Sequence, residues 1–154
     1  MDISMMMDGY KFNYRVAAIF EYGDKVLIQK SDKDTFYSLI GGRVKFNETS
    51  LQAIKREIKE EIGFSVEENI KLARVYENFF EYNSTRYHEL LFIYVIQIKS
   101  YDEIEKQKDF LCCDKSTTKM TWIAKSQLNG IDIRPAEIKQ IFGENSLKHG
   151  IILE

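Results

Sequence analysis

The spacing of apolar residues changes at Thr49, and this change constrains the fold more than any other feature. Beyond it, four apolar residues recur at intervals of three, four and four, the spacing of one helix face: Leu51, Ile54, Ile58 and Ile62. Thr49 and Gln52 fit a capping box, and Gly63 suits a left-handed C-cap. The pattern therefore predicts a helix from about Ser50 to Ile62, with this apolar stripe in the core.

The opposite face of the same helix carries carboxylates. Glu57, Glu60 and Glu61 stand at i, i+3 and i+4, and Glu48 lies just before the helix. Four carboxylates brought together repel one another unless a positive group lies among them, either Arg56 or a metal ion. Carboxylate oxygens suit Mg²⁺ or Mn²⁺. Because Glu-rich helices with interspersed lysines are usually solvated, the glutamates alone favour a plain surface helix.

The residues around the helix change that balance. Gly41 and Gly42 allow a close approach of the backbone to a ligand or ion. The segment fits a long pattern of glycine, five residues, Glu, seven residues, Arg-Glu, an aliphatic residue, any residue, Glu-Glu, any residue, glycine and an apolar residue. Its nine positions, spread across 23 residues, are occupied by Gly42, Glu48, Arg56, Glu57, Ile58, Glu60, Glu61, Gly63 and Phe64.

The probability of such a match by chance is negligible. The segment resembles the Nudix box of the Nudix hydrolase family. One departure is Ile40, which stands where many relatives have proline. We expect this difference to alter the stiffness of the loop and not the chemistry.

The resemblance implies an α+β fold, an α/β/α sandwich with a mixed sheet flanked by helices, and the remaining sequence is compatible with this layout. Hairpins are predicted from strands 13–21 and 26–29 and from strands 72–82 and 86–98, the latter pair joined at Asn83-Ser84-Thr85. A strand over 119–123 contains Trp122. A charged loop is expected over 102–114, one helical turn over 125–128, and a helix with Pro135 at its first position through Phe142.

Roles for the box residues follow from the resemblance alone. Glu57 and Glu61 would be the primary metal ligands, and Glu60 would share a second ion or its waters. The carbonyl of Gly41 would add a ligand, next to Gly42. Glu48 would pair with Arg56 and hold the loop against the helix, which also reduces repulsion among the glutamates.

The implied reaction is metal-assisted hydrolysis of a phosphoanhydride bond. A carboxylate would remove the proton from the attacking water. Within the box, Glu57 or Glu60 is the candidate base. Outside it, Glu89 comes first, followed by Asp109 and Asp114, although an ordinary surface acid is the commoner role for each of the three.

Substrate residues are harder to identify from sequence. Arg15 opens the first long strand and Arg43 follows the glycines, so either could bind phosphate. Four aromatic residues could stack on a ring, but strand aromatics more often form a core or a dimer interface: Phe79, Phe80, Tyr82 and Tyr87. A homodimer is therefore among the expected partners. His88 is expected to be structural.

Composition limits the other classes of function. The 154 residues fit one domain over 1–154, and a net charge of −2 gives no field that favours nucleic acid. No apolar run is long enough for a bilayer, and residues 1–8 lack the pattern of a secretory signal. The adjacent Cys112 and Cys113 make neither a disulfide framework nor a zinc site. We therefore expect a cytoplasmic protein with a small nucleotide-like substrate.

Three readings compete for the function. The first is an active hydrolase of a nucleoside diphosphate derivative such as a nucleoside triphosphate, ADP-ribose or a nucleotide sugar. The second is a catalytically silent module of the same fold that binds nucleotides. The third is an interaction domain with an acidic helix, which leaves the nine-position match unexplained. The intact set Glu57, Glu60 and Glu61 favours the first.

Overall fold

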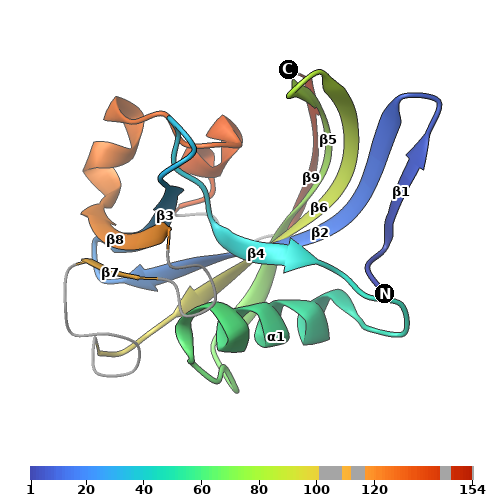
Figure 1. Ribbon diagram of the computed structural model, residues 1–154. Coiled ribbons are helices and arrows are strands. Elements are labelled where there is room, and N and C mark those ends of the chain that lie inside the picture. The colour runs from blue at the N-terminus through green and yellow to red at the C-terminus, as the bar shows by residue number, and fades with distance from the viewer. Residues whose placement is uncertain (101–108, 112–116, 143–146, 154) are drawn as a thin grey trace.

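The chain folds around one mixed β-sheet (Figure 1). The computed structural model describes residues 1–100, 109–111, 117–142 and 147–153. The strands within these residues are β1 (Ser4–Met7), β2 (Tyr10–Tyr22), β3 (Lys25–Ser31), β4 (Ile40–Arg43), β5 (Ile70–Tyr82), β6 (Thr85–Gln97), β7 (Asp109–Leu111), β8 (Thr118–Ala124) and β9 (Lys148–Leu153). The helices are α1 (Ser50–Ile62) and the 3-10 helices η2 (Lys125–Gly130) and η3 (Ala136–Gln140).

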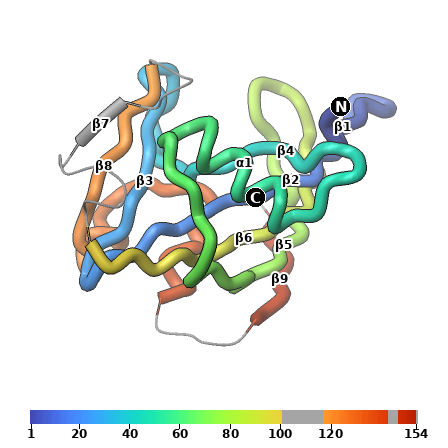
Figure 2. The backbone as a smooth tube through the Cα atoms, turned by 90° about the horizontal axis from the view of Figure 1, so that it is seen from below, coloured from blue at the N-terminus to red at the C-terminus, as the bar shows by residue number. Residues whose placement is uncertain are grey.

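Strand β2 organises the sheet. It pairs in parallel with β6 along one edge, from Tyr10 opposite Arg86 to Glu21 opposite Gln97. Along its other edge it pairs antiparallel with β1, then β4, then β3. The longest path through the sheet is β7-β8-β3-β2-β6-β5-β9, and Figure 2 shows β2, β6, β5 and β9 following one another in this order. The mixed sheet predicted from the sequence is confirmed.

Helix α1 has the predicted bounds and both predicted caps. The Thr49 hydroxyl accepts from the Gln52 N–H, the Gln52 side chain accepts from the Thr49 N–H, and Gly63 has φ 70°. The expectation that Leu51 belongs to the core is wrong, since it is 40% exposed. It lies in the first turn, where no earlier turn completes its packing. Ala53 and the carboxyl-bearing Glu61 are buried instead.

The caps of α1 give a first testable prediction. Thr49→Ala removes the side-chain acceptor of the Gln52 N–H and should lower the free energy of unfolding by about 1 kcal/mol. Urea unfolding followed by circular dichroism measures it. Ser65→Ala, at an exposed position after the helix, should leave the midpoint unchanged. Equal midpoints for the two variants would contradict a stabilising cap.

The two faces of the sheet carry separate cores, so the predicted α/β/α arrangement is confirmed. On one face, α1 packs Ile54 and Ile58 against a cluster that includes Phe20 and Trp122. On the other face, the segment carrying η2 and η3 contributes Leu128 and Ile138 to a second cluster. Each face of the sheet is therefore covered by its own cluster of buried apolar residues.

Other expectations need correction or lie outside the described residues. Pro135 is not the first residue of a helix reaching Phe142. It precedes the short η3, which ends at Gln140. The loop expected over 102–114 contains the strand β7, which pairs with β8, and its other residues, with Cys112, Cys113 and Asp114, lie outside the described residues. Among the described residues, no helix has the length and apolar character needed to span a bilayer.

Candidate functional site

The carboxylates of Glu57 and Glu61 lie against the two glycines of β4. The Gly41 N–H donates to Oε2 of Glu61 at 3.2 Å, and Glu61 is fully buried. A Cβ added at Gly42 would overlap the carboxylate of Glu57. Gly41 and Gly42 of β4 are called the glycine cradle, because a larger residue at position 42 would occupy the space of the Glu57 carboxylate. The capped helix fixes both carboxylates relative to this cradle, because positions 57 and 61 are one helical turn apart.

Arg56 holds the acidic groups around this cradle. Its Nε and Nη2 donate to the two carboxylate oxygens of Glu48 at 2.7 and 3.0 Å. Its Nη1 donates to Glu57 at 2.6 Å and to Glu60 at 3.2 Å, and Nη2 also reaches the carbonyl of Arg43 at 3.0 Å. The pair between Glu48 and Arg56 expected from the resemblance is present. One guanidinium therefore offsets the repulsion among three carboxylates.

The same contacts shift two pKa values. The hydrogen bond from Arg56 is the main cause that lowers the pKa of Glu48, and the bond to Glu48 is the main cause that raises the pKa of Arg56. Because the pKa of Glu48 is below its ordinary value of 4.5 in the folded chain, this pair stabilises the fold above that pH and the contribution disappears as pH falls through the lowered pKa.

The linkage predicts a measurable pH dependence. Glu48→Gln should unfold more easily than the parent protein at pH 7, and the difference should shrink as the pH falls below 4.5. Chemical unfolding between pH 7 and 3 measures it. A difference that stays constant across this range would contradict a charged Glu48 as its source.

The acidic residues do not form a closed set of ligands. Within the part of the chain that the structure describes, no group of three or more His, Cys, Asp or Glu side chains is placed so that it could hold a metal ion. Glu57 and Glu61 lie at the glycines, while Glu60 is 46% exposed and contacts Arg56. The chemistry of the donors still fits a hard divalent cation, since two carboxylates flank a cradle that a Cβ would fill. The role of all three as ligands stays a prediction.

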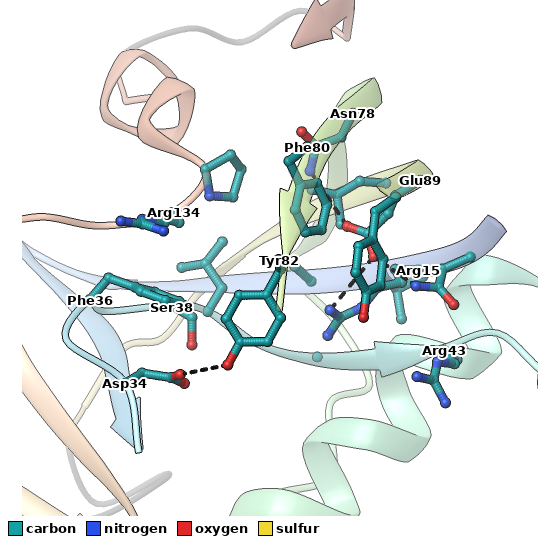
Figure 3. Close-up of a pocket in the computed structure, with 18 of the residues that line it drawn as sticks. Arg15, Asp34, Phe36, Ser38, Arg43, Asn78, Phe80, Tyr82, Glu89 and Arg134 are labelled. Carbon is teal, nitrogen blue, oxygen red and sulfur yellow. Dashed lines mark hydrogen bonds and ion pairs between the residues drawn. The ribbon is translucent and has the colours of Figure 1, made fainter. Parts of the chain in front are cut away.

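A cavity of about 380 Å³ opens next to the cradle, and Gly41 and Arg43 belong to its lining (Figure 3). Arg15 lies opposite Arg43 across the pairing of β2 with β4. Both predicted arginines line the cavity. Arg15 is 3.9 Å from the carboxylate of Glu89, and Arg43 is 3.5 Å from that of Asp2. The structure therefore brings two cations to the boundary between the cradle and the cavity.

Glu89, the first base candidate outside the box, is a buried residue of the cavity lining. It is 4% exposed and accepts hydrogen bonds from the side-chain amides of Asn13 at 3.1 Å and Asn78 at 3.4 Å. These amides fix the direction of its carboxylate. Asp109 lies in β7, but its side chain is outside the described residues.

Aromatic rings form two walls of the cavity. Phe80 and Tyr87 stack at 4.7 Å with 5° between their planes, and the Arg134 guanidinium lies 4.3 Å over the ring of Phe36. The Tyr82 hydroxyl donates a hydrogen bond to Asp34 at 3.3 Å, and Figure 3 shows these two side chains next to each other among the lining residues.

Several lining residues were missed by the sequence analysis. Asn78 could have been found, because it shares the strand face of Phe80 and Tyr82. Phe36 and Arg134 come from irregular segments far apart in the chain. No sequence pattern links these two residues, so their contact could not be predicted from the sequence.

Comparison with a family model identifies one family, and comparison with solved structures identifies one fold. The model of the NUDIX domain matches residues 11–141. Among solved structures, a mutator MutT protein from Bacillus halodurans is 20% identical with a TM-score of 0.71, covering 90% of this chain and 88% of that one. A MutT NUDIX hydrolase from Burkholderia pseudomallei is 19% identical with a TM-score of 0.66, covering 85% and 98%. No curated protein sequence gave a match.

Proposed function

Because this chain belongs to the NUDIX domain family and is a Nudix hydrolase, we propose that it cleaves a phosphoanhydride bond in a nucleoside diphosphate derivative with the help of Mg²⁺ or Mn²⁺. Nucleoside triphosphates, ADP-ribose and nucleotide sugars are the candidate substrates. The observation that carries the proposal is the adjacency of two parts. The carboxylates of Glu57 and Glu61 lie at the glycine cradle, and Arg15 and Arg43 line the neighbouring cavity. We also propose that residues 1–154 form a single domain.

Glu57 and Glu61 are the proposed metal ligands, together with Glu60 and the backbone at Gly41. When bound, a divalent ion neutralises charge on the phosphate oxygens and makes a bound water more acidic. Arg56 supports this arrangement, because its hydrogen bond to Glu57 fixes the carboxylate that lies at Gly42. We propose that the exposed Glu60 side chain, which Arg56 contacts at 3.2 Å, rotates away from Arg56 when the ion binds.

The chain's other groups have proposed roles around the substrate. Arg15 and Arg43 bind phosphate oxygens, because both residues line the cavity and pair with each other next to the glycines of the cradle. The nucleoside part lies deeper in the cavity, against Phe80 and Tyr87. Three carboxylates compete for the role of base: Glu57, Glu60 and Glu89. Glu89 is fixed by Asn13 and Asn78, which suits a group that must hold one position.

A substrate screen tests the proposal. Purified protein is incubated with nucleoside triphosphates, ADP-ribose and nucleotide sugars in Mg²⁺ or Mn²⁺, and the products are identified by mass spectrometry. Cleavage in H₂¹⁸O then shows which phosphorus received the water oxygen. We expect at least one compound to be cut between two phosphates, with the reaction abolished by chelation. No cleavage of any diphosphate compound would overturn the proposal.

The cradle makes a separate prediction at Gly42. Gly42→Ala places a methyl group where the Glu57 carboxylate lies, so this carboxylate must move while the helix and strand keep their backbone. We expect a loss of about tenfold or more in kcat/KM, with little change in melting temperature. Gly130→Ala is the matched control, since an added Cβ there meets no atom within 4 Å. Unchanged activity in Gly42→Ala would contradict a fixed role for Glu57.

A further inference from the structure

The aromatic residues near the end of β5 point to opposite faces of the sheet. Phe80 lines the cavity and stacks on Tyr87. Phe79, the preceding residue, faces the other side, where its ring lies 4.3 Å from that of His88. Two of the three aromatic residues there, Phe80 and Tyr82, therefore line the cavity. Phe79 lies on the face that α1 covers elsewhere.

On that second face, one row of side chains crosses five strands in register. Met5 pairs with Phe12, Phe12 with His88, His88 with Phe79, and Phe79 with Leu153. Their common orientation is supported by contacts on both faces. The His88 ring touches Phe12 and Phe79, while Ser4, the neighbour of Met5, bonds Asn13 on the cavity side. These five residues are called the cross-strand row.

The cross-strand row lies beyond the part of the sheet that α1 covers. Tyr14, Phe92 and Tyr94 on the same face belong to the core or pack against it under the helix. Toward the row, exposure rises: Met5 is 56% exposed, Leu153 is 78% exposed, and His88 is also exposed. Figure 1 shows β1, β2, β6, β5 and β9 rising together away from α1, toward the upper right of the view. Apolar side chains also continue on both sides of the row, with Tyr10 at 51% and Ile151 at 61% exposure.

We propose that a second copy of this chain packs face to face on the cross-strand row, forming a two-fold symmetric dimer. Five strands at about 4.8 Å give a width of roughly 24 Å, and three rows of side chains give a height of roughly 20 Å. Each copy would contribute about 500 Å², so the pair buries about 1,000 Å². That total lies at the lower limit for a specific interface. Packed sheet faces of this kind lie about 10 Å apart.

The charges around the row favour a copy of the same chain over a different class of partner. Glu81 and Arg86 face each other across β5 and β6, and Glu77 lies 3.6 Å from His149. A border with both signs is complementary to itself in a two-fold interface. A nucleic acid or an anionic lipid surface would instead require an excess of basic residues. The cavity opens on the opposite face, so a dimer leaves it accessible.

Sedimentation equilibrium of the full chain tests the dimer. For the parent protein we expect the average mass to rise from 18.1 kDa toward twice this value, with a dissociation constant of about 1–100 µM. Leu153→Glu and Met5→Glu each place a like charge in both copies and should raise this constant at least tenfold. Leu51→Glu, an exposed leucine on α1, is the control and should leave it unchanged.

Three outcomes would overturn the dimer. The parent protein could remain at 18.1 kDa up to several hundred micromolar. Leu51→Glu could weaken association as much as Leu153→Glu does. The mass could also grow past two copies, which a closed two-fold contact does not allow. Circular dichroism of each variant shows that its fold is intact, since all three positions are exposed. Hydrolysis by Leu153→Glu should match the parent protein, which separates this test from that of the proposed function.

Discussion

Replacing Glu61 by glutamine is expected to lower kcat by roughly 10²–10³-fold, the largest effect of any single substitution proposed for this chain. Glutamine keeps the size of the side chain and one oxygen for the Gly41 N–H. It removes the negative charge that a divalent cation needs, and a ligand carboxylate contributes several kcal/mol to charge stabilisation at such a site. Because Glu61 is fully buried beside Gly41, solvent screens the loss of its charge only weakly.

Steady-state kinetics on the substrate found in the screen measures this effect. Glu57→Gln should give a loss of similar size, and Glu67→Gln is the control, because Glu67 is 82% exposed and pairs only with Lys55 among the contacts described. Binding of Mn²⁺ followed by electron paramagnetic resonance gives a readout independent of turnover. If both Gln variants kept full activity with an intact fold, the site would have to lie elsewhere.

Arg56→Ala is expected to lower the free energy of unfolding by about 2–3 kcal/mol and to reduce hydrolysis at least tenfold. The substitution removes hydrogen bonds to three carboxylates and to the Arg43 carbonyl. Glu48 and Glu57, whose side chains are 15% and 12% exposed in the parent protein, then lose the cation that both of them contact. Loss of one partner from a buried ion pair costs about 3–5 kcal/mol, and the partial exposure of Arg56 reduces that figure.

Two comparisons separate charge from geometry at this position. Arg56→Lys keeps the positive charge, but a lysine ammonium cannot bond both carboxylate oxygens of Glu48 and also Glu57 in the geometry of the guanidinium. Compared with Arg56→Ala, this variant should therefore recover part of the stability and little of the activity. Adding Mg²⁺ should stabilise Arg56→Ala more than the parent protein, because the ion replaces the missing cation among the glutamates. Equal stabilisation of both would contradict a shared site for Arg56 and the metal. Thermal unfolding with and without Mg²⁺ makes the measurement.

The sequence predicted the helix and its neighbours because their signals are local. The bounds of α1 depend on Thr49, Gln52 and Gly63, which all lie within or beside the helix. The two hairpins likewise formed at the predicted turns, with Asn83 and Ser84 at positive φ between β5 and β6. Glu61 was predicted as a metal ligand on the face opposite the apolar stripe, but its burial at the glycine cradle depends on β4, which the helical spacing does not include.

Long-range pairing explains what the sequence could not predict. Strands β1, β4 and β9 were missed because each is short and is defined by a distant partner, as β9 is by β5. The cavity was also invisible, since Arg15, Asn78 and Arg134 come from separate parts of the chain. Only alternation along β5 could have shown that Phe79 and Phe80 serve different faces.

The parallel pairing of β2 with β6 also sets the order in which a growing polypeptide acquires its parts. Asn13 bonds Glu89 across 76 residues of sequence, whereas every capping contact of α1 spans only a few residues. A nascent chain released by the ribosome as far as Gly63 already contains all the residues that form and cap α1, but β2 has no parallel partner until β6 has been synthesised. Such distant pairing is slow to form, so the cavity matures after the acidic helix. A chain that ended before residue 97 would lack the last residue of β6, which pairs with Glu21 of β2.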